Sequence, residues 1–272
     1  MLRTRIITAV VLLAVLLAIV LAGSPMAFAL ALCVFFAAAA WESFRLFKTG
    51  FPIVGAVIWT VALAVILLRH EVQRAPWLFG LCVAIWVLRL APALKFGLPA
   101  LDTLSNRLLS AQYGVTLLAS FVGMMLLFTH SALYLLSVLA LVWIADIGAY
   151  FSGKAFGKNK LAPSISPGKS WEGAIGGWLA VMVIGLAVSM TPALADSFPA
   201  YVRLKWGGAG LFAVLSLITV ASVVGDLFES MLKRRAGFKD SSNLLPGHGG
   251  VLDRIDALIP VLPLAVFVDA WL

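Results

Sequence analysis

The chain has 272 residues, of which 62% are hydrophobic and 12% are charged, and its formal net charge is +8. A soluble domain usually carries about 25% charged residues, so this composition excludes an ordinary water-soluble globule. The positive charge suits an anionic membrane surface or a phosphorylated substrate. We find neither a recognition-helix pattern nor a basic-aromatic module, so we expect no nucleic-acid partner.

The N-terminal segment allows two interpretations. Arg3 and Arg5 precede a long apolar run, and Ala27-Phe28-Ala29 resembles a signal-peptidase site. A cleaved signal peptide is one interpretation, and an uncleaved first helix is the other. We favour the uncleaved helix because apolar sequence resumes at once and a second span follows without a soluble domain.

Apolar segments recur along the whole chain. A helix that crosses a bilayer needs roughly 20 mostly apolar residues. We therefore predict an all-α, polytopic integral membrane protein with about nine transmembrane helices. The predicted spans are Ile6–Ala22, Pro25–Ala40, Phe51–Leu68, Pro76–Leu94, Gln112–Phe128, Ser131–Phe151, Ala174–Thr191, Gly208–Phe228 and Ala257–Leu272.

The distribution of Lys and Arg predicts the orientation. With the N-terminus in the cytoplasm, 15 of the 20 Lys and Arg residues lie on the cytoplasmic side and four lie outside, while Arg89 falls within a span. This bias is the positive-inside pattern. We predict one transmembrane domain over residues 1–272. Residues 1–130 are expected to be mainly scaffold, and residues 131–272 are expected to supply the catalytic helices and cytoplasmic loops.

Cys33 and Cys82 both sit inside apolar runs. A zinc site needs clustered ligands, and these two residues are far apart in the sequence. We predict two free cysteines, with neither a structural disulfide nor a zinc site.

One carboxylate, Asp146, lies inside the apolar segment Trp143–Tyr150. A charged group near the bilayer centre costs on the order of 3 kcal/mol, so such residues usually face a polar cavity and have a function there. Asp146 and Tyr150 are one helical turn apart and share a face. The alternative is that Asp146 lies near the cytoplasmic end of its helix and pairs with a lysine.

The loop over residues 152–173 is rich in Gly, Ser and Lys. It contains Lys154, Lys158, Lys160 and Lys169. Glycine lets backbone N–H groups approach phosphate oxygens, and lysine supplies positive charge. The spacing of a P-loop is absent. A basic loop without a ligand is therefore the alternative interpretation.

The polar stretch from Ser230 to Asp256 is the strongest functional signal. Just before it, Asp226 and Glu229 share a helix face with Ser230. Asp253 and Asp256 are three residues apart at the start of the last predicted helix. Such carboxylates suit Mg²⁺, which usually binds through one or two carboxylates together with substrate phosphates.

The same stretch contains a glycine pair and a histidine. Gly249-Gly250 before a helix N-terminus predicts an anion site. His248 can donate a hydrogen bond or carry a proton. A surface histidine without a function is the alternative.

Two motifs together resemble a known family. The first is Ser230-Met231-Leu232-Lys233-Arg234, followed by Lys239-Asp240, Ser242, Leu245-Pro246, His248 to Val251 and Asp253 to Asp256. The second is Ser166 to Gly173, together with Asp146 and its aromatic neighbours. These motifs are similar to the signature of the phosphatidate cytidylyltransferases. The resemblance runs from about residue 143 to residue 256 and is highly specific.

The resemblance implies a nucleotidyltransferase of phospholipid biosynthesis. It would make CDP-diacylglycerol and pyrophosphate from CTP and phosphatidic acid, with Mg²⁺ as cofactor and room for a second metal ion. The implied catalytic residues are Asp226, Asp253, Lys239, His248 and Arg254. The implied metal ligands are Asp226 and Asp253, followed by Asp146 and Asp256. The implied substrate-binding residues are Ser166, Lys169, Ser170, Glu172, Lys233, Arg234, Gly249 and Gly250.

The separate motifs are then expected to form one site. Asp226, Asp146 and the loop Ser166–Glu172 should face one another on the cytoplasmic side of a bacterial inner membrane. A cavity that opens sideways would admit phosphatidic acid from the leaflet. A homodimer is expected because it is the commonest oligomer. A CTP-dependent lipid or polyprenol kinase is one alternative, and a transporter that uses the buried acidic residues is another.

Overall fold

The computed structural model describes residues 10–11, 14–15, 17–20, 22–69 and 76–272. Within them lie seven helices that are long and apolar enough to cross a membrane. The chain is therefore an all-α polytopic membrane protein, as predicted. Part of the first predicted span, Ile6–Ala22, lies outside the described residues.

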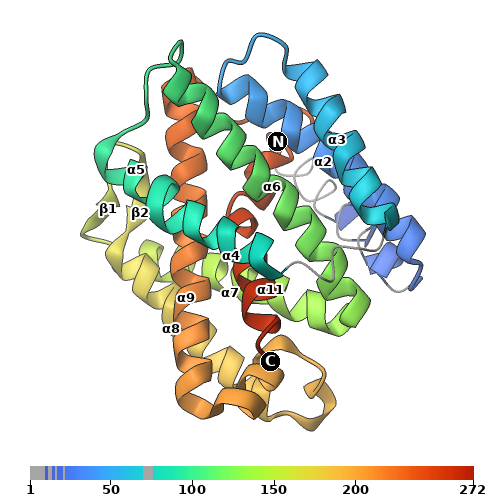
Figure 1. Cartoon of the computed structure of the whole chain (residues 1–272). Coiled ribbons are helices and arrows are strands. Elements are labelled where there is room, and N and C mark those ends of the chain that lie inside the picture. Colours follow the sequence, from blue (N-terminus) through green and yellow to red (C-terminus); the bar gives the residue numbers. More distant parts are fainter. Residues whose placement is uncertain (1–9, 12–13, 16, 21, 70–75) are drawn as a thin grey trace.

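The helices form one bundle (Figure 1). They are α2 (Pro25–Leu46), α3 (Pro52–Arg69), α4 (Pro76–Ile85), α5 (Ala91–Phe96), α6 (Leu104–His130), α7 (Ala132–Phe156), α8 (Trp171–Met190), α9 (Phe198–Ala236), α10 (Leu252–Ile255) and α11 (Leu258–Asp269). The two strands are β1 (Lys160–Ala162) and β2 (Ser166–Ser170), which pair antiparallel between α7 and α8. Helix α7 packs on α8, α8 on α9, and α2 on both α3 and α6.

Several helix ends follow from local sequence. Ser131 ends α6 and caps α7, where its hydroxyl accepts a hydrogen bond from the Tyr134 N–H at 3.0 Å. Helix α6 begins earlier than its predicted span because Thr103 caps it and polar residues are accommodated in its first turns. Between α4 and α5, residues Trp86–Leu90 form a π-helix (η2). Pro92 follows it, and its ring disfavours a regular turn with the carbonyl of Leu88.

Helix α9 is two helical segments joined at a kink. Gly207 has φ 69° and ψ −169°, which no regular helix allows. This backbone conformation favours glycine because a Cβ atom would be strained there. The longer segment then carries Asp226, Glu229 and Lys233 to the end of the bundle.

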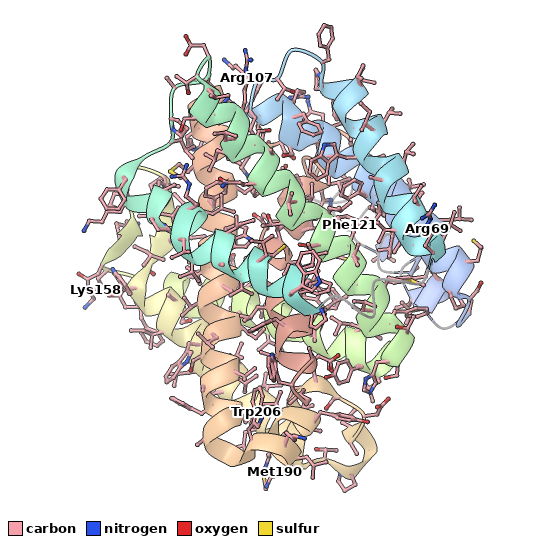
Figure 2. The ribbon with its side chains drawn as sticks, in the orientation of Figure 1. Arg69, Arg107, Phe121, Lys158, Met190 and Trp206 are labelled. Carbon is pink, nitrogen blue, oxygen red and sulfur yellow. The ribbon has the colours of Figure 1, made fainter. Side chains whose placement is uncertain are left out.

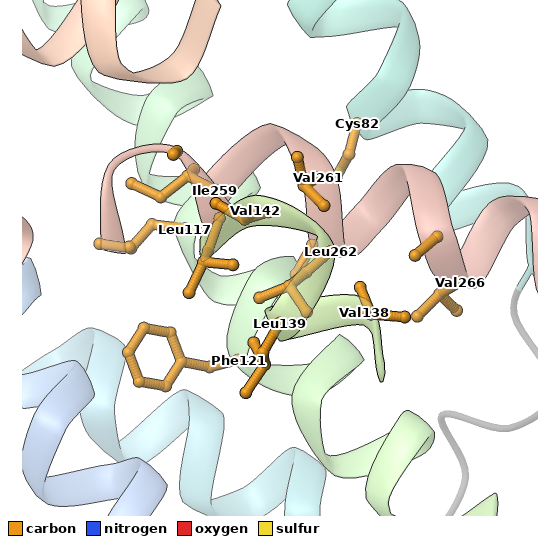
Figure 3. Close-up of a cluster of buried hydrophobic side chains, with 14 of the residues drawn as sticks. Cys82, Leu117, Phe121, Val138, Leu139, Val142, Ile259, Val261, Leu262 and Val266 are labelled. Carbon is orange, nitrogen blue, oxygen red and sulfur yellow. The ribbon is translucent and has the colours of Figure 1, made fainter. Parts of the chain in front are cut away.

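The ninth predicted span, Ala257–Leu272, is shorter than predicted. Helix α11 has 12 residues, or about 18 Å at 1.5 Å per residue, whereas the hydrocarbon core of a bilayer is about 30 Å thick. Figure 3 shows why the segment is nonetheless apolar: Ile259, Leu262 and Val266 point into a cluster with Leu117, Phe121 and Leu139. Helix α11 is apolar because α4, α6 and α9 surround it.

Charged and apolar side chains separate as a membrane bundle requires. In Figure 2, Phe121 lies inside the bundle, whereas Arg107 and Lys158 lie at its margins. Both cysteines are free, as predicted.

Candidate active site

A cavity of about 440 Å³, with charged side chains in a largely apolar lining, lies between α7, α8 and α9. Asp146 lines it from α7, Asp226 and Ser222 line it from α9, and Lys169 lines it from β2. The Nζ atom of Lys169 lies 2.5 Å from Oδ2 of Asp226. Three separate sequence motifs, predicted to face one another, thus meet in this cavity.

Small residues let α7 and α8 approach closely beside the cavity. A Cβ atom on Gly177 would lie 2.5 Å from the Ala145 carbonyl oxygen, and one on Gly173 would lie 2.9 Å from the Ala149 carbonyl oxygen. Helices in membranes associate closely through such small residues. The close approach fixes Asp146 relative to the start of α8.

The β-hairpin places Lys169. Strand β2 leads directly into α8, whose N-cap is Ser170. The Ser170 hydroxyl accepts a hydrogen bond from the Gly173 N–H at 3.1 Å. Glu172 accepts hydrogen bonds from the backbone N–H groups of Lys158 and Asn159, and from the Asn159 side chain at 2.7 Å. In this structure the two predicted substrate-binding residues Ser170 and Glu172 therefore hold the hairpin, and through it Lys169.

A second cluster is centred on Lys233 and Asp253. Lys233 forms an ion pair with the buried Glu229 and another with Asp253, whose Oδ1 lies 2.5 Å from Nζ. Oδ2 of Asp253 accepts hydrogen bonds from the Ser241 N–H and the Gly250 N–H, each at 2.8 Å, and from the Ser241 hydroxyl at 2.9 Å. Both oxygens of Asp253 thus contact the protein, and Lys233 ties α9 to the loop that precedes α10.

These contacts determine the charge of Asp253. Burial by itself raises the pKa of this carboxyl, but hydrogen bonds from Lys233 and from the Gly250 and Ser241 N–H groups, with the positive charge of Lys233, outweigh burial. The pKa of Asp253 is therefore lowered, and the group is a carboxylate at neutral pH. Asp256 behaves in the opposite way: burial and then the negative charge of Asp226 raise its pKa well above the ordinary value.

The structure reveals a residue that the sequence analysis missed, Glu42 on α2. It is fully buried, and its carboxylate accepts hydrogen bonds from the Leu252 N–H at 2.6 Å, the Val251 N–H at 3.1 Å and the Ser241 hydroxyl at 3.1 Å. The Ser242 hydroxyl donates a fourth. The predicted span ends at residue 40, whereas helix α2 continues to Leu46 and includes Glu42. The signal that could have found Glu42 is an acidic residue directly after an apolar run.

Gly250 is glycine because these carboxylates surround it. A Cβ atom there would lie 2.0 Å from the Ser241 hydroxyl oxygen and 2.3 Å from Oε1 of Glu42. Gly249 has φ 82°, a conformation that favours glycine. In this structure the Gly250 N–H donates to Asp253, and the Val251 and Leu252 N–H groups donate to Glu42.

The other predicted residues line different cavities. Lys239, His248, Gly249 and Arg254 line a polar cavity of about 540 Å³ beside the loop over residues 239–250. Arg254 donates a hydrogen bond to the His248 carbonyl at 2.9 Å. Arg234 lines a third cavity, with Lys95 and Ser164. Ser166 begins β2 and lines none of these three cavities.

The carboxylates of the first cavity fit Mg²⁺ by their chemistry. Asp146 and Asp226 both line this cavity, and a cation between them would relieve the repulsion of two carboxylates. Across the described ranges, no group of three or more His, Cys, Asp and Glu side chains has the spacing of a metal site. Mg²⁺ usually needs only one or two carboxylates, because water and substrate phosphates complete its shell. Asp146 and Asp226 meet that requirement.

Known proteins match this chain over nearly its whole length. The model of the cytidylyltransferase family matches residues 3–271. A phosphatidate cytidylyltransferase of Pseudomonas aeruginosa is 42% identical over 281 aligned residues, which cover 100% of this chain and 99% of the relative. A phosphatidate cytidylyltransferase of Haemophilus influenzae is 39% identical over 288 aligned residues, which cover 97% and 96%. The phosphatidate cytidylyltransferase of Staphylococcus aureus strain COL is 44% identical over 131 residues, or 48% of this chain.

Proposed function

Because the chain belongs to the cytidylyltransferase family, we propose that it transfers cytidylate from CTP to phosphatidic acid, with Mg²⁺ as cofactor. The products are CDP-diacylglycerol and pyrophosphate. The observation that carries the proposal is the cavity between α7, α8 and α9, where Lys169 pairs with Asp226 beside Asp146. It combines positive charge for phosphates with carboxylates for a cation, among helices that cross a membrane.

The bond changes follow from the two substrates. An oxygen of the lipid phosphate attacks the α-phosphorus of CTP and forms a new P–O bond. The bond from the α-phosphorus to the bridging oxygen of the pyrophosphate breaks, and its electron pair leaves with pyrophosphate. The attacking oxygen is already ionised at neutral pH, so no strong general base is needed. The barrier comes mainly from charge repulsion and from positioning.

The residues of the cavity act on these two parts of the barrier. Lys169 can neutralise charge on the triphosphate, and the hairpin held by Ser170 and Glu172 places it beside Asp226. Asp146 and Asp226 would hold Mg²⁺, with Asp253 and Asp256 as further proposed ligands. When bound, the metal supplies positive charge that stabilises the transferring and leaving phosphates.

We further propose that the active site faces the cytoplasm of a bacterial inner membrane and that the protein is a homodimer. The bias of Lys and Arg toward one side supports the orientation. The organisms of the relatives support a bacterial membrane. Cysteine labelling of intact and opened cells at position 158, in a variant that lacks Cys33 and Cys82, tests the orientation. We expect position 158 to be labelled in opened cells but not in intact cells. Labelling in intact cells would contradict the proposed orientation.

A product assay tests the reaction itself. Purified protein is mixed with phosphatidic acid, Mg²⁺ and CTP that is labelled on either the α- or the γ-phosphate. We expect the α-label in the lipid and the γ-label in pyrophosphate. Transfer of the γ-label to lipid, without cytidylate, would identify a kinase instead. Flux in proteoliposomes without turnover would identify a transporter.

A further inference from the structure

An apolar groove of about 320 Å³ lies beside α7. Its apolar lining comes from the N-terminal segment and from α2, α6, α7 and α11. The residues that matter most are Phe28, Ala31, Leu32, Phe121, Leu135 and Leu139. Its volume is in the range of small-ligand pockets, roughly 300–1,000 Å³.

One charged residue lines this groove within the described part of the chain, and it is Arg254. Leu245, Val251 and Ile255 lie around it, so the cation sits where the groove meets the polar loop. Arg254 also lines the polar cavity beside that loop, and its side chain is exposed. An apolar channel with an accessible guanidinium at the polar end matches the chemistry of an acyl chain that ends in a phosphate.

The groove adjoins the cavity that contains Lys169. Trp143, Asp146 and Tyr150 follow one another at helical spacing along α7, so they form one stripe on its surface. Trp143 lines the groove, whereas Asp146 and Tyr150 line the Lys169 cavity. Arg254 lines both the groove and the polar cavity beside the loop, so it lies at the polar end of the groove.

We propose that the groove binds an acyl chain of phosphatidic acid, that Arg254 binds the lipid phosphate, and that the Lys169 cavity takes the triphosphate of CTP. This assignment rests on the proposed function. The two anionic substrates then approach from opposite ends of the stripe on α7 and meet at Asp146. The groove holds and orients the acyl chain, and Arg254 supplies selectivity for a phosphate group.

Two kinds of variant separate chain binding from phosphate binding. Ala31→Phe adds an aromatic ring to the groove lining on α2. Ala37→Phe is the matched control, because Ala37 is an equally half-buried alanine of the same helix but does not line the groove. Arg254→Gln removes the guanidinium, and Arg254→Lys keeps the charge but loses the planar fork that binds phosphate through two hydrogen bonds.

The measurement is the KM for each substrate in mixed micelles, with dioleoyl and dihexanoyl phosphatidic acid. For Ala31→Phe we expect the KM for the dioleoyl lipid to rise about tenfold or more, as overpacking of a fitted site does. The KM values for the dihexanoyl lipid and for CTP should stay within about twofold, and Ala37→Phe should match the wild type in all three. Arg254→Gln should raise the KM for both lipids about tenfold or more and leave that for CTP nearly unchanged, with Arg254→Lys between.

The outcomes separate this inference from the proposed function. If the wild type makes CDP-lipid but Ala31→Phe leaves the dioleoyl KM unchanged, the groove assignment is wrong and the proposed function stands. If Arg254→Gln raises the KM for CTP rather than for lipid, Arg254 belongs to the nucleotide site. A wild type that makes no CDP-lipid overturns the proposed function. In addition, phosphatidic acid with a diazirine on its acyl chain should label peptides of α2 and α7, and labelling confined to other helices would also overturn the assignment.

Discussion

Glu42 is expected to control activity although it lies outside the cavity that contains Lys169. In the substitution Glu42→Gln, one carboxylate oxygen becomes an NH₂ group of the same shape. Oε1 accepts from the Val251 N–H and the Ser242 hydroxyl, and Oε2 accepts from the Leu252 N–H and the Ser241 hydroxyl. The amide nitrogen therefore faces one backbone N–H in either orientation.

The magnitude follows from these partners. A hydroxyl can rotate and accept a hydrogen bond from the new NH₂ group, but a backbone N–H cannot. An unpaired buried donor costs about 1–3 kcal/mol, and hydrogen bonds to a charged acceptor are worth more than those to a neutral one. A total of about 3 kcal/mol corresponds to roughly a 100-fold change in an equilibrium. If that cost falls on the loop from Ser241 to Leu252, kcat/KM should fall by up to about 100-fold.

The assay is cytidylate transfer, measured together with thermal unfolding in detergent. Ser43→Ala is the matched control, because Ser43 is the neighbouring buried residue and its hydroxyl has no hydrogen-bond partner among the described residues. It should retain nearly wild-type activity. Glu42→Gln and Ser241→Ala should be non-additive, since the two side chains share a hydrogen bond. More than half of wild-type activity in purified, folded Glu42→Gln would refute the reasoning.

Three further predictions concern the other parts of the site. Lys169→Gln should lower kcat/KM by about 100-fold or more, because it removes the cation paired with Asp226. The variant should still elute as a folded protein in size-exclusion chromatography. Near-normal kinetics would argue against a role for Lys169. Gly177→Val should lower the unfolding temperature, because a Cβ atom at this position would lie 2.5 Å from the Ala145 carbonyl oxygen. Gly208→Ala should change the unfolding temperature little, because a Cβ atom there has no neighbour within 4 Å. Equal unfolding temperatures for the two variants would contradict the close packing of α7 on α8. Removal of divalent cations by EDTA should abolish turnover, and added MgCl₂ should restore it; full activity in excess EDTA would exclude the proposed cofactor.

Local patterns were sufficient for much of the structure and for part of the site. The seven described spanning helices correspond to predicted spans because each is apolar over enough consecutive residues to cross lipid. Asp146 was predicted to face a polar cavity because a carboxylate is costly among apolar residues, and it does line one. The expected meeting of Asp226 with the loop Ser166–Glu172 is confirmed by the Lys169–Asp226 ion pair.

Residue type alone was not sufficient to predict which groups the charged side chains contact. Lys233 was predicted to bind substrate, and the fold instead surrounds it with Glu229 and Asp253. Glu172 has the chemistry of a ligand, but its oxygens hold the hairpin. In both cases the deciding contact comes from a residue distant in sequence, and no local pattern specifies it.

The amino-acid sequence by itself therefore determined that the chain is a membrane bundle with a nucleotidyltransferase signature, because hydrophobic length and motif spacing are local properties. Only the tertiary structure decided that α11 has 12 residues and packs among α4, α6 and α9, and that Glu42, about 200 residues before its partners, holds the signature loop. A buried helix and a lipid-facing helix are equally apolar, and a buried carboxylate acquires its meaning from the donors that packing brings to it.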